Sequence, residues 1–384
     1  MKSKITRILS YLLVALLASA VTLAVVVKRI PNSYSKLEEL EKLILERFIG
    51  EADQKEMEDA AADAMVGALG DRWSYYIPAD EFAAYMEQMN NAYVGIGVTI
   101  QQREDQMGLD VIAVTKDGPA EKAGIQVGDR IVAVSGTQIQ GMALQDVKNM
   151  IQGEANTTVE ITVDRAGTEM TMNVTRQKIQ TIVATGVMLD QEIGLVTIEN
   201  FDARCADETI AAIESLLEQG AKKLIFDVRN NPGGYKNELV EVLDYLLPEG
   251  VLFRSELYTG KVEQDMSDAE CLDIPMAVLV NADSYSAAEF FAAALRDYDK
   301  AVIVGQQTVG KGYFQSTFQL SDGSAVGLSI GKYYTPKGVS LAGVGITPDI
   351  SIELDNETAA KLYYDQLDPM EDPHILAAMD ALKE

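Results

Sequence analysis

Apolar and polar residues follow different periods in successive parts of the chain. Residues 8–27 are uncharged and mostly apolar. From Ser35 to about Asn91, apolar residues recur at helical spacing. From Tyr93 the pattern changes to short alternating runs between glycines, and from about Lys178 strand-like and helix-like runs alternate. The pattern predicts a multidomain α/β protein with an N-terminal membrane anchor, a helical region, a β-rich domain and an α/β core.

The first thirty residues predict a signal anchor. Residues 8–27, at about 1.5 Å per residue, are long enough to cross the roughly 30 Å hydrocarbon core of a membrane. Three basic residues precede the run and two follow it, which favours a short N-terminus inside the cell. Ala18-Ser19-Ala20 resembles a signal-peptidase site, but further apolar residues follow it. We expect a single-pass cell-membrane protein with the remainder outside the cytoplasm, or a secreted one if the segment is cleaved.

Residues 31–92 predict a helical N-terminal region. Leu37, Leu40 and Leu43 form an apolar stripe, and Lys55–Leu69 and Ala79–Met89 predict further helices. No residue here carries an evident chemical role. We expect the leucine stripe to pack within the chain or to form a homodimer.

Residues 93–177 combine strand-like runs with glycine-rich turns. The order is a strand with two glycines over Tyr93–Ile100, turns within Gly118–Gly136, a helix over Ala143–Ile151, and strands over Thr158–Arg165 and Glu169–Arg176. This order resembles a PDZ domain. In such a domain an extended peptide adds to a sheet edge while glycine-freed amides hold its carboxylate. The predicted peptide-binding residues are Tyr93, Gly95, Ile96, Gly97 and Val98.

Residues 178–355 alternate between strands and helices, as in layered sheets with covering helices. The predicted strands are Ile193–Ile198, Lys223–Val228, Met276–Val280, Ala301–Gly305, Tyr313–Leu320 and Ala325–Lys332. Helices are predicted over Ala206–Gln219, over Gly234–Leu247 and from about Ser286. Residues 356–384 predict an acidic, helical C-terminal tail.

The composition excludes several classes of function. Lys plus Arg number 32 against 59 Asp plus Glu, a net charge of −27, which argues against nucleic acid and favours a solvated acidic surface. Cys205 and Cys271 allow one disulfide, although two buried free thiols are the preferred interpretation. His374 is the only histidine, so a histidine-rich metal site cannot be built. A nucleophilic serine would then need another base, for which lysine is a known alternative.

Ser286 is the candidate nucleophile. The run Ser286-Ala-Ala-Glu289 is also a capping box, in which serine and glutamate satisfy amides at a helix start. A helix N-terminus nevertheless suits a nucleophile, because the free amide of Ala287 can donate to an oxyanion. Ser284, two residues earlier, is a competing nucleophile.

Lys311 is the candidate base, and it stands in a Gly-Lys-Gly turn. It could equally be a solvated turn lysine, and Gly305–Lys311 matches most of a phosphate-binding loop. Gly312, however, replaces the hydroxyl residue that would bind magnesium. To act as a base the lysine must be neutral near pH 7, which requires burial to lower its pKa. Gln315 would contact it only if the glycines bend the chain.

The turn after Asp227 is the candidate oxyanion site. The sequence from Asp227 to Gly234 ends a strand in Asn-Asn-Pro-Gly-Gly. The amides of Gly233 and Gly234 could donate to a developing oxyanion. The same residues could form only a turn before a helix, and spacing does not decide between these readings.

Together these segments resemble the C-terminal processing peptidases, also called tail-specific or carboxyl-terminal proteases. These are serine-lysine endopeptidases that carry a PDZ domain. The resemblance implies Ser286 as nucleophile, Lys311 as general base, Gln315 as its positioning residue, and Ala287 with Gly233 or Gly234 as the oxyanion hole. No metal or cofactor is implied. The matching segments are Tyr93–Ile100, Gly118–Gly136, Asp227–Gly234, Ser284–Asp297, Thr308–Gln315 and Tyr333–Asp349.

The resemblance also implies substrates. The PDZ domain would capture proteins or peptides by exposed apolar C-termini. An arginine at the end of a PDZ strand, matched here by Arg165, would take part in peptide binding and in gating. Tyr285 is bulkier than the small residue usual beside the nucleophile, and Asp71-Arg72-Trp73-Ser74 departs from the usual Asp-Pro-x-Ser. The alternatives are a catalytically inactive PDZ peptide-binding scaffold and an acyl-CoA-type enzyme on a related crotonase-like core.

Overall fold

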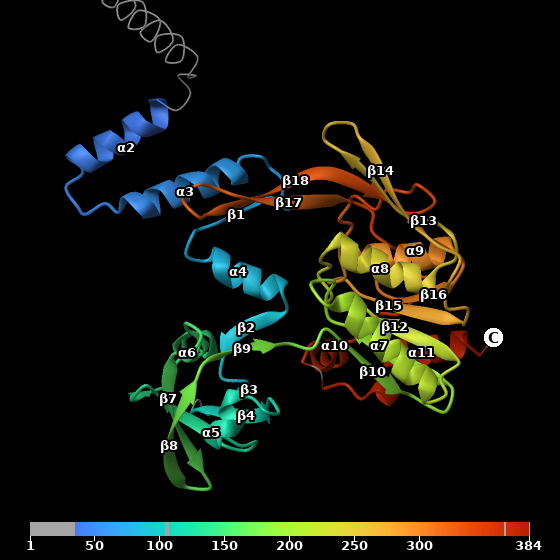
Figure 1. Cartoon of the computed structure of the whole chain (residues 1–384), viewed down its shortest axis with the longest axis horizontal. Helices are drawn as coiled ribbons and strands as arrows, with labels where there is room; N and C mark the ends of the chain where they lie inside the picture. The colour runs from blue at the N-terminus through green and yellow to red at the C-terminus, as the bar shows by residue number, and fades with distance from the viewer. Residues whose placement is uncertain (1–34, 104–106, 365, 384) are drawn as a thin grey trace, which may run out of the picture. The chain divides into compact units, whose positions relative to one another are not determined.

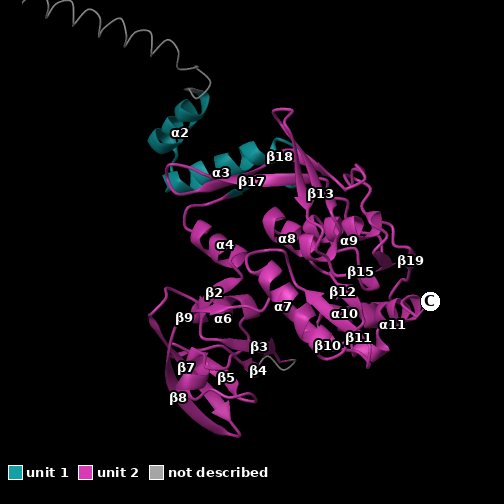
Figure 2. Ribbon diagram, turned by 45° about the vertical axis from the view of Figure 1, so that its right-hand side comes forward, with its two compact units in different colours: residues 1–76 teal, residues 77–384 magenta. Residues whose placement is uncertain are grey.

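The computed structural model describes residues 35–103, 107–364 and 366–383. The chain divides into two compact units, residues 1–76 and 77–384 (Figure 2). The predicted anchor at residues 8–27 lies outside the described residues. Among the helices that the structure does describe, none has the length and apolar character needed to cross a membrane.

In the described part of the first unit, the helices are α2 (Ser35–Arg47) and α3 (Gln54–Gly67). Asp53 begins α3 by accepting the Glu56 amide at 3.0 Å. The apolar stripe of α2 remains exposed, with Leu40 at 52% and Leu43 at 43% of their full accessibility. The predicted helices are confirmed here, and the short strand β1 (Tyr75–Ile77), which the sequence analysis did not predict, lies between two of the predicted helices.

The second unit begins with α4 (Phe82–Met89) and a β-rich domain (Figure 1). At the base of this domain, β2 (Ala92–Gly95) pairs antiparallel with β9 (Gln177–Gln180). A separate sheet in the order β3-β4-β5-β7-β8, with β6 beside β5, forms its body. The predicted first strand is therefore two strands in two sheets, separated at Ile96 and Gly97. The other elements are β3 (Val98–Gln102), β4 (Leu109–Val114), α5 (Pro119–Ala123), β5 (Arg130–Val134), β6 (Thr137–Gln138), α6 (Leu144–Ile151), β7 (Thr158–Arg165) and β8 (Thr168–Thr175).

A six-stranded sheet in the order β10-β11-β12-β15-β16-β19 forms the centre of the α/β core. Its strands are parallel except for β10. Alternate residues face opposite sides, so Phe226 packs with α7, α8 and α9 while Ile225 faces the other way. These elements are β10 (Ala184–Met188), β11 (Ile193–Ile198), α7 (Cys205–Glu218), β12 (Lys223–Asp227), α8 (Lys236–Leu246), β15 (Met276–Val280), α9 (Ala287–Asp297), β16 (Ala301–Gly305) and β19 (Ile350–Ser351).

The C-terminal segment covers the second face of this sheet. Ile375, Ala378 and Met379 of α11 (Pro373–Ala381) pack in one cluster with Ile225 and neighbouring strand residues. The predicted helical character of the tail is confirmed, but α11 is a packed part of the core because the apolar second face of the sheet requires cover. Before it come α10 (Asn356–Tyr363) and a 3₁₀ turn (Pro369–Glu371).

A second, antiparallel sheet adjoins the core. Within it β14 pairs with β13, β13 with β18, and β18 with β17. The rings of Phe253, Phe290 and Tyr333 pack against one another in tilted and edge-on contacts, with centroids 4.6–5.8 Å apart. These contacts join the sheet to α9. The strands are β13 (Gly250–Leu257), β14 (Val262–Ser267), β17 (Tyr313–Gln319) and β18 (Ala325–Tyr334).

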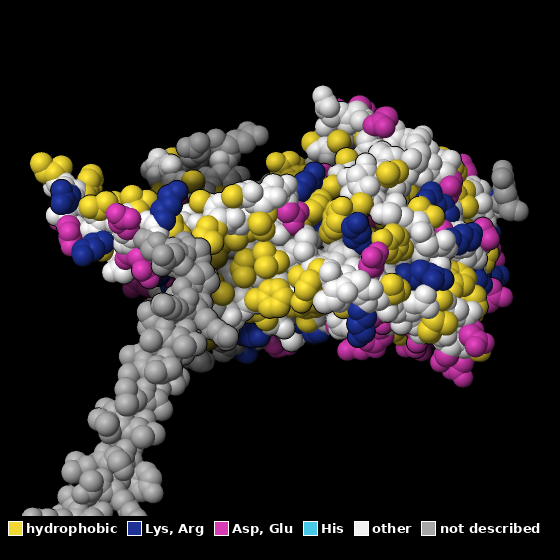
Figure 3. Space-filling view, turned by 90° about the horizontal axis from the view of Figure 1, so that it is seen from above, with side chains coloured by type: hydrophobic (Ala, Val, Ile, Leu, Met, Phe, Trp, Pro, Cys, Tyr) yellow, Lys and Arg dark blue, Asp and Glu magenta, His cyan; other side chains and the backbone are white. Residues whose placement is uncertain are grey.

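The sequence predicted a solvated acidic surface and two buried free thiols, and the structure can be compared with both predictions. On the right-hand part of the face in Figure 3, acidic and basic side chains are interspersed. Both cysteines are free thiols; Cys205 is buried as predicted, whereas Cys271 is only half-buried. Cys271 is partly accessible because it lies in a connecting loop outside the helices and strands.

Candidate active site and peptide groove

Ser286 lies at the junction between β15 and α9. Its φ of 59° and ψ of −119° are strained for a residue with a side chain, which costs about 1–3 kcal/mol. Such a turn between a strand and a helix presents a serine hydroxyl at the edge of a sheet. Ser286 is half-buried, whereas Ser284 is fully buried and donates its hydroxyl to the Val228 carbonyl at 2.7 Å. The structure therefore gives Ser284 a structural role and leaves Ser286 as the candidate nucleophile.

The carboxylate of Glu289, in the first turn of α9, joins the two candidate catalytic segments. It is fully buried and accepts the Ser286 amide at 3.1 Å and the Lys311 amide at 2.9 Å. The Gly310 amide at 2.7 Å and the Thr308 hydroxyl at 2.5 Å complete its partners. Burial raises the pKa of Glu289, and these hydrogen bonds oppose that rise. The capping-box glutamate predicted from sequence thus also holds the backbone of Lys311.

Tyr333 is a site residue for which the sequence analysis named no role. It lies on β18 with 3% of its surface exposed, and its hydroxyl donates to the Lys311 carbonyl. Burial raises its pKa well above 10, the charge of Glu289 adds to the rise, and a hydrogen bond with the Ser286 side chain opposes it. One phenol hydroxyl therefore contacts both candidate catalytic residues. Its place in the run Tyr333-Tyr334-Thr335-Pro336 gave no signal of these contacts.

The side chain of Lys311 extends beside Tyr285. Its Nζ lies 5.9 Å from the centre of the Tyr285 ring, within the range of a cation–π contact. Tyr285, which departs from the small residue usual in the family, therefore stands next to the candidate base. Lys311 itself is half-buried.

The glycine turn lies directly against Ser286. A Cβ added to Gly233 would stand 2.7 Å from the Ser286 Cβ and 2.8 Å from the Ala287 nitrogen, so only glycine fits. The Gly233 amide, however, donates to the Asn231 side chain at 2.8 Å. Within the described residues, the amides of Ala287 and Gly234 have no hydrogen-bond acceptor. These two amides are the ones available to an oxyanion in this conformation.

Gln315 follows an irregularity in β17. The register between β17 and β18 shifts between Phe314 and Gln315. The Gln315 amide donates to the Ser329 hydroxyl at 2.9 Å and to the Tyr313 carbonyl at 3.3 Å. These contacts hold it against β18, and its action on Lys311 stays a prediction.

A buried network of charged side chains lies next to the glycine turn, at the end of β12. Arg229 pairs with Asp227 on the same segment and with Asp372, which begins α11, at 2.7 Å. The single histidine, His374, is buried beside Arg229, with 3.3 Å between Nδ1 and the guanidinium. His374 is thus part of a structural network that ties α11 to the end of β12.

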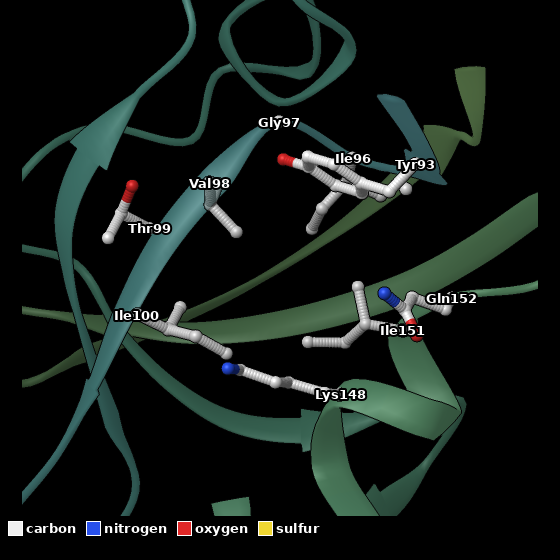
Figure 4. A pocket seen from close by; sticks show the side chains of 10 residues that line it. Tyr93, Ile96, Gly97, Val98, Thr99, Ile100, Lys148, Ile151 and Gln152 are labelled. Carbon is white, nitrogen blue, oxygen red and sulfur yellow. The ribbon is translucent and has the colours of Figure 1, made fainter. Parts of the chain in front are cut away.

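A pocket of about 270 Å³ lies between β3 and α6 in the β-rich domain (Figure 4). All five residues predicted to cradle a peptide, Tyr93, Gly95, Ile96, Gly97 and Val98, line it. Thr99 and Ile100 of β3 and Lys148, Ile151 and Gln152 from the α6 side also line it, and the sequence analysis missed these.

The backbone around this pocket suits a carboxylate. The carbonyls of Ile96 and Gly97 accept the amides of Ala120 and Thr115, so they are turned into the domain. The amides of Ile96 and Gly97 have no acceptor in the described part of the chain. Among the strands that the structure describes, β3 pairs only with β4, which leaves its other edge open for an added strand.

Arg165 does not line this pocket. It forms a two-pronged ion pair with Asp129, at 2.6 and 2.7 Å, and donates to the Gly124 carbonyl at 2.7 Å. Arg165 holds Asp129, which lowers the pKa of that carboxyl. In this conformation the Arg165 side chain is committed to contacts inside the domain, and its part in peptide binding and gating stays a prediction.

Two sequence families match this chain. Residues 192–352 match peptidase family S41, and residues 111–165 match the PDZ domain. A probable CtpA-like serine protease of Staphylococcus aureus strain COL is 34% identical over 327 residues, which cover 84% of this chain and 65% of that protein. The chain thus spans just under two thirds of that relative's length.

Solved structures agree with these matches. The photosystem II D1 C-terminal processing protease shares 28% identity, with a TM-score of 0.50 over 90% of this chain and 94% of that one. A putative S41 protease from Bacteroides fragilis, at 16% identity, shares the fold with a TM-score of 0.55 over 88% of this chain and 92% of its own.

Proposed function

We propose that this chain, which matches peptidase family S41 over residues 192–352 and the PDZ domain over residues 111–165, is a serine endopeptidase of the C-terminal processing type. The observation that carries the proposal is the Glu289 carboxylate, which accepts the amides of both Ser286 and Lys311. A capping glutamate needs only its own helix. One that also accepts the Lys311 amide holds the backbone segments of the candidate nucleophile and the candidate base together.

In the proposed reaction Lys311 acts as the general base. Its neutral amine takes the Ser286 proton while the serine oxygen bonds to the carbonyl carbon of the scissile peptide. The amides of Ala287 and Gly234 donate to the oxyanion, a contribution of about 10²–10³ in rate for each donor. The lysine then gives the proton to the leaving amine as the carbon–nitrogen bond breaks. Water, activated by the same amine, hydrolyses the ester and restores Ser286. Gln315 would position Lys311 after a local rearrangement.

The substrates proposed are proteins or peptides with exposed apolar C-termini. The open edge of β3, the unsatisfied amides of Ile96 and Gly97 and the apolar lining by Ile96, Val98 and Ile151 support this. The terminal carboxylate would bind the two amides, and the last side chain would enter the apolar part of the pocket.

We also propose a membrane location and a dimer. The apolar run at residues 8–27 would act as a single-pass anchor, with the catalytic part outside the cytoplasm. The exposed stripe on α2, including Leu40 and Leu43, would bury against a second copy. Detergent dependence of extraction and sedimentation of a Leu40→Glu variant test these two points separately.

Cleavage of an unfolded protein with an apolar C-terminus tests the proposed activity. The parent should cut it, and Ser286→Ala and Lys311→Ala should each reduce the rate by at least about 10⁴-fold. Ser284→Ala is the matched control, and it should retain activity at reduced stability because that hydroxyl is buried. Equal cleavage by the parent and Ser286→Ala would refute the proposal. Binding without cleavage in every form would favour a peptide-binding scaffold.

A further inference from the structure

Lys148 is a charged residue in an otherwise uncharged pocket. Of the ten residues that line the peptide groove, it alone carries a charge. It belongs to the second turn of α6, whose inward residues Val147 and Ile151 are buried in the domain core.

The Lys148 side chain makes no ion pair or hydrogen bond within the described residues. Lys300, by contrast, pairs with Asp273 at 2.6 Å, and Lys236 pairs with Asp265 at 2.8 Å. Figure 4 shows the Lys148 chain lying across the groove, with its nitrogen beside the tip of Ile100. The exposed ammonium group thus lies at the side of the groove, with no ion-pair partner among the described residues.

The register of an added strand identifies what this nitrogen would contact. Side chains of an extended peptide alternate between two faces, about 3.3 Å apart along the strand. Val98 and Ile100 face the groove, and Thr99 points away from it (Figure 4). A peptide whose carboxylate lies at Ile96 and Gly97 places its last side chain near Val98 and Ile151. The next side chain on the groove face, the third from the end, then lies near Ile100 and Lys148.

We propose that Lys148 selects an acidic side chain at the third position from the C-terminus of the bound peptide. The proposal rests on the peptide-capture role proposed above. The apolar part of the pocket reads the last residue, and Lys148 reads the charge two residues before it. The occupant is therefore a C-terminus of the form Glu-x-apolar or Asp-x-apolar. Because the ammonium is exposed, an ion pair here gives discrimination of only a few-fold.

Peptide binding to the full chain in detergent, carrying Ser286→Ala to prevent cleavage, tests this. Three fluorescent decapeptides ending in Val would differ only at the third residue from the end, with Glu, Gln or Lys. We expect the Glu peptide to bind about fivefold tighter than the Gln peptide, and the Lys peptide to bind most weakly. Lys148→Met should abolish the difference, and Lys148→Glu should reverse it. Lys122→Met, at an exposed lysine of α5, is the matched control and should leave the order unchanged.

Several outcomes would overturn the inference. If Lys148→Met weakened all three peptides by the same factor, the lysine would bind the terminal carboxylate or support the fold. If the parent bound the three peptides equally, or bound none, Lys148 would not read the third residue. Binding in the absence of catalysis separates the two proposals. A correct peptide order in a chain whose parent form cuts nothing would refute only the peptidase, and cleavage without the order would refute only the role of Lys148.

Discussion

The Glu289 carboxylate accepts the backbone amide of Lys311 at 2.9 Å, although 22 residues separate them in the chain. The same oxygen accepts the Ser286 amide at 3.1 Å. Because backbone groups are the donors, the contact fixes the two segments and leaves the hydroxyl and the amine free to react. Glu289 is therefore a positioning residue in this account.

Replacement of Glu289 should impair catalysis. Glu289→Gln keeps one oxygen but turns an NH₂ group toward backbone amides, which removes acceptors and leaves buried donors unsatisfied. We expect kcat to fall at least about 100-fold with KM changed much less, because the peptide groove is untouched. Steady-state kinetics and thermal melting would be measured together. Glu241→Gln, at an exposed position on α8, should change neither quantity. A fully active Glu289→Gln enzyme would contradict this role.

The Tyr333 hydroxyl should contribute more to kcat than to the free energy of unfolding. Tyr333→Phe removes the hydroxyl that contacts the Lys311 carbonyl and the Ser286 side chain, and it keeps the buried ring. We predict about a tenfold loss in kcat and a loss of about 1 kcal/mol in the free energy of unfolding. Single-turnover kinetics would report the first and urea denaturation the second. The neighbouring Tyr334→Phe, whose hydroxyl binds Glu256, serves as the control. Equal effects at the two positions would show that Tyr333 has no specific role.

The sequence predicted which residues form this site better than it predicted the contacts between them. The strand before Ser286, the helix after it, the glycine turn at Gly233 and the cradle at Tyr93–Val98 all follow from local patterns of apolar, glycine and capping residues. The structure confirms these elements, because each depends on residues that are neighbours in the chain.

The contacts that depend on distant segments could not be predicted. The capping box alone accounted for Glu289, and nothing in its local sequence pattern indicated a contact with Lys311. Arg165 stood at the end of a strand, but its pairing with Asp129 depends on the bend of a loop 36 residues earlier. The packing of α11 under the sheet likewise required the three-dimensional arrangement, since an acidic C-terminal helix alone reads as a solvated tail.

The buried pair of Arg229 and Asp372 should stabilise the core through α11. Asp372→Ala removes a partner of Arg229 and also the cap of α11, where Asp372 accepts the His374 amide at 2.9 Å. We expect the free energy of unfolding to fall by about 3 kcal/mol or more. Glu357→Ala, which breaks the exposed pair with Lys361, should cost less than about 1 kcal/mol. Urea denaturation compares the two, and similar small losses would mean that the network contributes little.

Asp202 should make stability depend on pH near neutrality. It is buried beside the bridge between Phe201 and Gly234; burial, and then the charge of Glu238, raise its pKa to about 7. Because this pKa exceeds that of the unfolded chain, the stabilising contribution is present below about pH 4 and is lost as pH rises through 7.

Asp202→Asn removes that titration. Relative to the parent, the variant should gain stability on the order of 2 kcal/mol between pH 5 and pH 8. Guanidinium denaturation at both pH values measures the difference, with the exposed Asp207→Asn as control. Parallel pH profiles for the parent and Asp202→Asn would show that Asp202 does not titrate in this range.

Covalent labelling of the serine tests the central claim most directly. The full chain would be treated with a fluorophosphonate, which reacts with activated serine hydroxyls, and the modified residue would be located by peptide mass mapping. The account predicts rapid, stoichiometric modification of Ser286, at least about 100-fold slower modification in Lys311→Met, and none in Ser286→Ala. Modification of Ser284, or equal labelling rates with and without the Lys311 amine, would contradict a Ser286 nucleophile activated by Lys311.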